Sequence, residues 1–217
     1  MLGIIALLLG FTFSQALGRY EARSIAVVDE ANAIGTAVLR ADLVPDSARN
    51  IARTSLRDYL QVRTEAAVFP VRSGEWEDLT TTAEKLHAKI WSSTQQVVGV
   101  DDGPIASLYV QSINEVIDSY GRRKAEILRH VPPLANLLLI SSFLLCCFAV
   151  GISAGLGKHR PPITSYMLIL LVVLSMFVVI DLDRPRRGPI QVPRESLHEL
   201  GNSVLAGDSL ASAVSTR

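Results

Sequence analysis

Residues 137–157 decide the fold: they read LLLISSFLLCCFAVGISAGLG and carry no charged side chain. Counted from the two prolines at 132 and 133, this gives about 25 residues before Lys158, enough to cross a hydrocarbon core of about 30 Å with some tilt. Proline does little damage at a helix start, where the first amide groups have no partner within the helix. The stretch therefore predicts a membrane-spanning helix over residues 132–157.

A second apolar run follows at 163–180, ITSYMLILLVVLSMFVVI, and it also lacks charge. Its length again matches a membrane-spanning helix. Only the five residues KHRPP, at 158–162, separate the two runs, so the helices must form an antiparallel hairpin. We expect the second helix of this hairpin over residues 163–181.

The N-terminal residues 1–18 form a shorter apolar run of about 16 residues, weakened by Ser14 and Gln15. Two interpretations fit it. A retained transmembrane helix would continue without a proline into the helical pattern at 19–39. A signal peptide would be cleaved near Ala16 and Gly18. It would also need a Lys or Arg ahead of the apolar run, and this chain has none there. We expect the retained helix and keep the signal peptide as the alternative.

The basic residues near the ends of the spans predict the orientation, because the cytoplasmic side of a membrane protein is enriched in Lys and Arg. With three spans, only Lys158 and Arg160 lie on the side opposite to the other basic residues. We therefore expect a multi-pass protein of the cell's inner (plasma) membrane. Its N-terminus and hairpin loop would lie outside, and residues 19–131 and the tail 182–217 in the cytoplasm.

Residues 19–131 predict a cytoplasmic domain of four helices, because apolar residues recur every three or four positions. We expect one helix to start after Pro45 with Asp46 as its N-cap, one after Pro70, and one at Pro104. The tail is rich in Ser, Ala and Gly after about residue 205, where we expect disorder. The fold class is thus an all-α membrane protein with about three transmembrane helices. The apolar stripes expected to be buried are Ile25, Val28, Ala31, Gly35 and Val38; Trp76, Leu79, Ala83, Leu86 and Ile90; and Ile105, Leu108, Ser112, Ile113, Val116, Ile117 and Tyr120.

Composition and motifs argue against several classes of function. The 21 basic residues balance the 21 acidic ones, so net charge gives no reason to expect a nucleic acid partner. The four histidines are scattered, the two cysteines are adjacent within an apolar run, and neither set has the spacing of a metal site. There is also no glycine-rich phosphate loop and no nucleophile elbow. We expect a protein that is not an enzyme and needs no metal and no cofactor.

The first cytoplasmic helix carries a polar segment that includes Asp29, Glu30 and Asn32. Such a segment either lines an ion path or an interhelical hydrogen-bonded surface, or is a solvated helix face with weak salt bridges. Small residues on the same helix allow another backbone to approach closely. Ala31, Asn32 and Gly35 are therefore candidates for helix packing between copies of the chain.

Two carboxylates and an arginine stand where the predicted third span ends, at Asp181, Asp183 and Arg184. Unpaired charge is costly at the edge of a bilayer. One interpretation is an interfacial anchor, in which arginines contact lipid phosphates and the aspartates pair with them. The other is a charged ring that forms an ion pathway or gate when several copies surround an axis.

Three segments of the chain, taken in order, resemble the bestrophin-like domain family of bacterial membrane proteins. They are residues 28–42, VDEANAIGTAVLRAD; residues 114–118, NEVID, leading to the prolines at 132 and 133; and residues 181–188, DLDRPRRG. The more remote resemblance to bestrophins themselves implies a helical subunit that assembles, often as a pentamer, around an ion-conducting axis. Similar proteins have a further apolar segment ahead of the first span, so we expect a short form or a misplaced start. The calcium-sensing acidic run of animal bestrophins has no counterpart, so neither calcium gating nor anion selectivity is carried over.

The leading hypothesis is an oligomeric, bestrophin-like integral membrane protein that acts as an ion channel. Its partners would be the lipid bilayer, further copies of itself and inorganic ions. The alternative is a non-conducting membrane scaffold or sensor whose cytoplasmic helical domain binds a protein partner. Apolar surface left exposed after packing within the chain would favour the scaffold.

Overall fold

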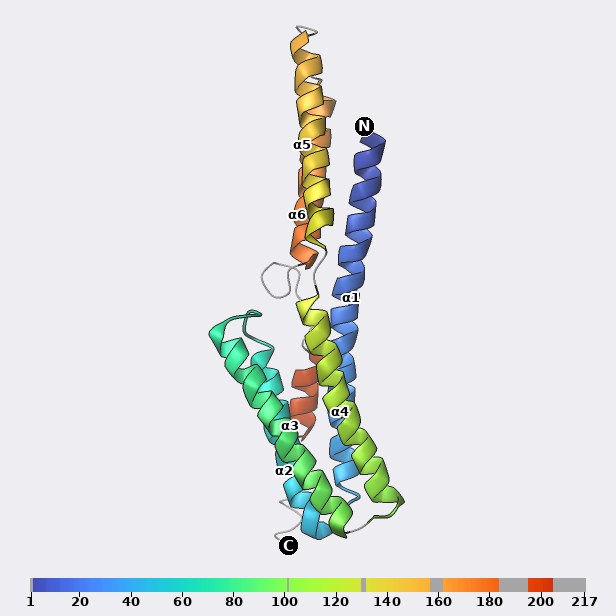
Figure 1. Ribbon diagram of the computed structural model, residues 1–217, viewed down its shortest axis with the longest axis vertical. Helices are drawn as coiled ribbons and strands as arrows, with labels where there is room; N and C mark the ends of the chain where they lie inside the picture. The colour runs from blue at the N-terminus through green and yellow to red at the C-terminus, as the bar shows by residue number, and fades with distance from the viewer. Residues whose placement is uncertain (1, 101, 130–131, 157–161, 184–194, 205–217) are drawn as a thin grey trace. The chain divides into compact units, whose positions relative to one another are not determined.

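The computed structural model describes the chain except for residues 1, 101, 130–131, 157–161, 184–194 and 205–217 (Figure 1). The regular structure of the described residues is α-helical throughout, which confirms the expected all-α class. Residues 195–204 are helical as well. The other helices are α1 (Leu2–Ala41), α2 (Asp46–Ala66), α3 (Gly74–Val100), α4 (Pro104–Leu128), α5 (Pro133–Leu156) and α6 (Ile163–Asp183).

The chain divides into two compact units. The apolar unit comprises Met1–Ala22 and Arg129–Gln191, and the helical domain comprises Arg23–Leu128 and Val192–Arg217. Helix α1 contributes residues to both units, since the division falls between its residues 22 and 23.

In the apolar unit, the segments Leu137–Leu156 and Ile163–Asp183 are long and apolar enough to cross a membrane. They correspond to the two spans expected from the sequence. Large apolar side chains such as Phe148 and Phe177 are exposed on them, and hydrocarbon would cover such surface at no cost. Among the residues whose side chains the structure describes, no third segment meets the same criterion.

The start of α1 and the end of α6 share a small buried cluster within the apolar unit. Ala16 has no exposed surface, and Val179 and Leu182 are almost fully buried beside it. Helix α6 therefore has a packed end, while much of its length exposes apolar side chains.

The starts of α2 and α3 follow local rules. Pro45 is the N-cap of α2 with φ −54°, and Asp46 is the first helical residue rather than the cap itself. A carboxylate in the first turn still interacts favourably with the positive end of the helix dipole. Ser73 precedes α3, and its Oγ accepts a hydrogen bond of 3.2 Å from the backbone N–H of Trp76, as an N-cap serine does.

The helical domain has one main core, formed by α1, α2, α3, α4 and the helical residues 195–204. In the predicted stripe on α3, Ala83 and Ile90 are buried in this core, while Leu79 and Leu86 are half-buried. Trp76 is buried in a separate small cluster with Val71 and Ile127. The stripes on α1 and α4 are correct only in part. Four of their residues, Ile25, Val28, Ile105 and Leu108, are exposed, because the buried face of α1 is offset toward Val27, Ile34 and Ala41 and that of α4 begins at Ala106 and Tyr109.

The helical residues 195–204 were not expected from the sequence. Leu197 has no exposed surface and belongs to the main core, and Leu200 and Val204 pack against that core. A β-carbon placed on Gly35 of α1 would lie 3.2 Å from Leu200 Cδ1. The tail therefore contributes to the domain before residue 205, while the disorder expected after about 205 lies outside the described residues.

Candidate functional site

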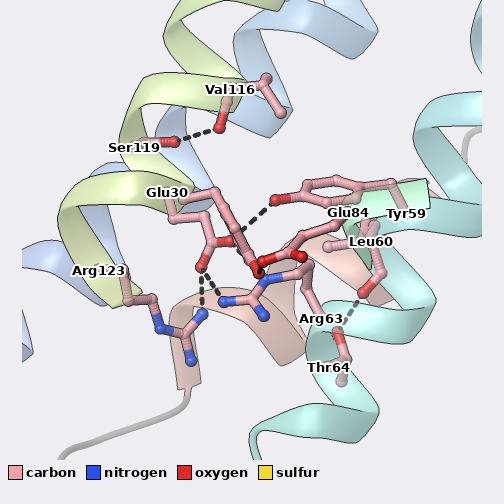
Figure 2. A network of polar contacts seen from close by, with 10 residues as sticks. Glu30, Tyr59, Leu60, Arg63, Thr64, Glu84, Val116, Ser119 and Arg123 are labelled. Atoms are coloured by element: carbon pink, nitrogen blue, oxygen red, sulfur yellow. Dashed lines mark hydrogen bonds and ion pairs between the residues drawn. The ribbon is translucent and has the colours of Figure 1, made fainter. Parts of the chain in front are cut away.

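The most highly organised polar site in the described residues is centred on Glu30 of α1, which has no exposed surface (Figure 2). Arg63 of α2 donates from Nε to Glu30 Oε1 at 2.6 Å and from Nη2 to Oε2 at 3.2 Å. This two-point contact matches the planar guanidinium to the planar carboxylate, the geometry that makes such ion pairs strong and directional.

Two further donors complete the shell around Glu30. Arg123 of α4 donates from Nη1 to Glu30 Oε2, and the Tyr59 hydroxyl of α2 donates to Oε1 at 3.2 Å. Arg123 and Tyr59 are as fully buried as Glu30 itself. One carboxylate thus connects α1, α2 and α4. We refer to Glu30, Tyr59, Arg63 and Arg123 as the charge cluster.

The charge cluster has more positive than negative charge, since two guanidiniums surround one carboxylate. Burial alone would raise the pKa of Glu30, but the charges and hydrogen bonds of Arg63 and Arg123 outweigh it and lower that pKa to about 2. For Arg63, burial opposes the charged form, yet the nearby carboxylate raises its pKa above the ordinary value. For Arg123, burial prevails and lowers the pKa. Arg123 is therefore the less well compensated of the two cations.

Further polar and aromatic side chains of α3 and α4 lie beside the charge cluster. The Arg63 guanidinium lies 4.8 Å from the centroid of the Tyr120 ring, a cation–π distance. The ring of His87, on α3, lies 5.0 Å from that of Tyr59 and 4.7 Å from that of Tyr120. Tyr120 in turn donates its hydroxyl to Glu84 Oε1 at 3.0 Å, and Lys124 donates to the same oxygen. Helix α3 is thereby brought into the same network.

Burial lowers the pKa of His87 below 6.5, and the Arg63 charge lowers it further. Glu30 and Glu84 act in the opposite direction but more weakly. The imidazole is therefore neutral near pH 7, and its Nε2 is buried without a hydrogen-bond partner among the described residues. His87 fills the space between two tyrosine rings as an aromatic side chain.

The charge cluster is suited to holding helices together rather than to catalysis. Donors occupy both oxygens of Glu30, and its low pKa makes it a poor proton acceptor, so it is unsuited to general base catalysis. His, Cys, Asp and Glu residues in the described part of the chain do not gather in a group of three that could hold a metal ion. The charge cluster instead fixes the mutual position of three helices.

Different residues of the polar segment on α1 fit different interpretations. Asp29 and Asn32 are exposed, as a solvated face requires, whereas Glu30 forms the interhelical hydrogen bonds of the other interpretation. The sequence alone does not identify Arg63 or Arg123 as the partner of Glu30. The helical spacing does indicate that both arginines lie on buried faces, because Arg63 stands four residues after the buried Tyr59 on α2 and Arg123 three residues after the buried Tyr120 on α4.

The residues predicted for packing between copies lie in different environments. Ala31 is in the core of its own domain, and Gly35 lies next to Leu200 of the same chain. Asn32 is exposed and lines a groove between α1 and α4. Their role in assembly stays a prediction; Asn32 is exposed, Gly35 is half-buried and Ala31 is buried.

The residues predicted for an ion pathway lie at the end of α6. Asp181 and Asp183 are in its last turn, and each is largely buried within the apolar unit. Arg184 is outside the described residues. The two acids belong to the apolar unit, and the charge cluster belongs to the helical domain. Whether they act on ions stays a prediction.

Comparison with known proteins agrees with the resemblance seen in the sequence. The model of the Bestrophin-like domain matches residues 3–197, and thus nearly all of α1 to α6 and the start of the last helical stretch. No match was found among curated proteins or among solved structures. The match covers both units and includes the charge cluster, so the chain belongs to the bestrophin-like family.

Proposed function

We propose that the chain is one subunit of an oligomeric ion channel, or channel-like protein, of the cell's inner membrane. Membership of the bestrophin-like family supports a membrane protein of this kind. The structural observation that carries the proposal is the end of α6, where a helix of membrane length finishes in two largely buried carboxylates, Asp181 and Asp183. Repeated around an axis, such acids would form a negative ring.

The topology that goes with this proposal has three spans. The start of α1 would be the first, α5 the second and α6 the third, with the N-terminus outside and the helical domain in the cytoplasm. Basic residues near the span ends support this orientation. The shared cluster of Ala16, Val179 and Leu182 supports a first span that packs against the third.

The charge cluster would hold the cytoplasmic half of α1 in a fixed position. Because α1 contributes residues to both units, its fixation by α2 and α4 through Glu30 gives each subunit a rigid base for assembly. A single helix secured on two sides is a physically simple way to keep several subunits identical in an oligomer.

The first test is the detergent-corrected mass of the purified protein by light scattering. We expect a ring of four or more copies; a monomer or dimer that is stable across mild detergents would overturn the proposal. The second test is ion flux in liposomes, comparing the unmodified protein with Asp183→Asn. The exposed Asp78→Asn on α3 is a matched control. If Asp183→Asn and Asp78→Asn change the ion flux equally, the acid ring has no role in the mechanism.

The alternative function, a scaffold or sensor that binds a protein partner, also has an observation in its favour. The helical domain leaves large apolar side chains exposed, among them Ile25, Leu39 and Leu108. Surface of this kind marks an interaction site when it is contiguous. A protein that is monomeric in detergent, shows no flux and co-purifies with a different protein would favour this alternative.

A further inference from the structure

The connection between α2 and α3 carries apolar side chains where a polar loop is the rule. It reads AVFPVRS over residues 67–73, and we refer to these residues as the α2–α3 connection. Val68 is 58% exposed and Phe69 is half-buried. One exposed valine needs no explanation, but loops between helices are usually polar. The apolar character of this connection therefore indicates a contact with something other than water.

The α2–α3 connection is packed against the end of α4. Val71, Trp76 and Ile127 form a small buried cluster, and Phe69 packs against that cluster. Figure 1 shows the connection at the same end of the helical domain as the end of α4. The cluster thus ties the α2–α3 connection to the last turn of the helix from which the chain continues toward α5.

Along the chain, a helix of membrane length begins shortly after this cluster. Helix α5 begins at Pro133, six residues after Ile127. Even when fully extended, six residues span at most about 20 Å. The polar layer of a bilayer extends about 5–7 Å beyond the hydrocarbon core on each side. Where α5 enters a bilayer, the α2–α3 connection is therefore held close to that surface.

Arg72, within the connection, has a backbone conformation that arginine rarely adopts. Its φ is 65°, and it is the only non-glycine residue with a positive φ in the described part of the chain. Glycine adopts that conformation without steric cost, so the side chain rather than the backbone is the candidate for a role. The side chain is exposed. A guanidinium matches the geometry of a phosphate group, and its aliphatic stem can lie along apolar surface.

The charges beside the connection argue against a strongly anionic surface as the occupant. Glu75 and Glu77, in the first turn of α3, are exposed. They offset the attraction that Arg72 has for negative charge. Apolar contact and a direct contact with phosphate would therefore supply the binding, and a zwitterionic phospholipid offers both.

We propose that the α2–α3 connection inserts Val68 and the exposed part of Phe69 into the headgroup layer of the membrane, where Arg72 contacts a lipid phosphate. This inference rests on the proposed function only in requiring that α5 crosses a bilayer. It holds for either orientation of the chain and for any number of copies. The contact attaches the helical domain to the membrane at a second point beside the start of α5.

The first test measures how close residue 68 lies to lipid. Val68→Cys carries an environment-sensitive fluorophore in a full-length chain in which Cys146→Ser and Cys147→Ser remove the native cysteines. The protein is reconstituted in phosphatidylcholine vesicles that contain lipid with a nitroxide on the headgroup. We expect blue-shifted emission that the nitroxide quenches.

Leu43→Cys in the same background is the matched control. Leu43 is 60% exposed and lies in the connection between α1 and α2, so its exposure resembles that of Val68. The 21 residues of α2 separate the two connections, a length of about 31 Å. We expect no quenching by the headgroup nitroxide at residue 43.

Every other pattern overturns the proposal. Equal quenching at residues 68 and 43 would mean that the whole domain lies on the membrane. A blue shift at residue 68 without quenching would mean that a protein covers the connection, and neither effect would mean that water does. A fluorophore on Cys146, with only Cys147→Ser introduced, tests the span separately. If nitroxides on the acyl chains do not quench it, the membrane span of the proposed function fails first.

A second variant tests the arginine. Arg72→Gly suits a φ of 65° and removes the guanidinium, and circular dichroism checks that the variant folds. We expect quenching of the fluorophore at residue 68 to fall by about twofold or more. Arg72→Lys keeps a positive charge and should retain most of the quenching. Equal quenching in Arg72→Gly and in the chain with Arg72 would overturn the phosphate contact.

Discussion

The carboxylate of Glu30 on α1 and the guanidinium of Arg63 on α2 form a two-point hydrogen-bonded ion pair in the core of the helical domain, 33 residues apart in the chain. Such a pair is not automatically stabilising, because both ions lose their hydration on burial. Here the contacts of Tyr59 and Arg123 complete the hydrogen bonding of the carboxylate. One carboxylate thus ties α1, α2 and α4 together, with donors on both of its oxygens.

Removing the carboxylate charge should destabilise the helical domain strongly. Glu30→Gln leaves two buried guanidiniums without a counter-ion, a change that costs about 3–5 kcal/mol for comparable buried pairs. The two tryptophans of the chain, Trp76 and Trp91, both lie on α3, so their fluorescence follows the unfolding of this domain. We expect Tm to fall by roughly 10 °C or more. Glu115→Gln, whose pair with Arg122 is half-exposed, should change stability by less than about 1 kcal/mol.

Removing one cation of the charge cluster should lower the stability of the helical domain less than removing the anion does. Arg123→Met leaves Glu30 and Arg63 as a neutral pair and replaces the cation whose pKa burial already lowers. Methionine fills a similar volume without a charge to bury. We expect the Tm of Arg123→Met to lie between those of the unmodified protein and Glu30→Gln, by the same fluorescence measurement. A Tm at or below that of Glu30→Gln would show that Arg123 is indispensable to the charge cluster.

Acid should weaken the domain through Glu30 in a defined window of pH. Its pKa in the folded protein is about 2, against an ordinary value of 4.5, so the unfolded chain binds a proton first as the pH falls. The stabilisation from this shift is present above pH 4.5 and is lost between about 4.5 and 2. It amounts to about 3 kcal/mol. Denaturant titrations at several pH values measure the free energy of unfolding. Between about pH 4.5 and 2 this free energy should fall less steeply with decreasing pH in Glu30→Gln than in the unmodified protein. An equally steep fall in both proteins would assign the loss to other carboxylates.

His87 should act at higher pH than Glu30. Because its pKa is lowered below 6.5 in the folded protein, the unfolded chain again binds the proton first, and stability declines as the pH falls from 6.5. Phenylalanine retains a ring between Tyr59 and Tyr120. The substitution removes no hydrogen bond at Nε2, because that atom has no partner in the described part of the chain. We expect His87→Phe to abolish the decline that begins at pH 6.5. The exposed His198→Gln should retain it, and a decline shared by all three proteins would exclude His87 as the cause.

How far the sequence predicts this molecule depends on the range of the interactions. The apolar spans at 132–157 and 163–181 follow from composition alone, and α5 and α6 begin and end within two residues of them. Glu30 was identified as polar but not as buried, because its partners Arg63 and Arg123 come from distant parts of the chain. Leu197, Leu200 and Val204 carried a helical spacing, but whether such a short helix packs depends on the small residues of α1 opposite it.

The contact between Gly35 and Leu200 gives the last prediction. A β-carbon at residue 35 would lie 3.2 Å from Leu200 Cδ1, the mobile end of a flexible side chain. Gly35→Ala should therefore be tolerated, because alanine gains about 1 kcal/mol of helix propensity over glycine and Leu200 needs only a small shift. Gly35→Leu should lower the Tm of the domain, because its longer side chain would displace Leu200 from the core.

A compensating change distinguishes this contact from a general effect of bulk at residue 35. Leu200→Ala removes the side chain that Gly35→Leu would meet, so the double variant should recover part of the Tm that Gly35→Leu loses. Gly121→Ala on α4, where a β-carbon meets nothing within 4 Å, reports the gain in helix propensity alone. If the double variant is no more stable than Gly35→Leu, the leucine at 35 conflicts with residues other than Leu200, and the helical residues 195–204 do not determine the need for glycine there.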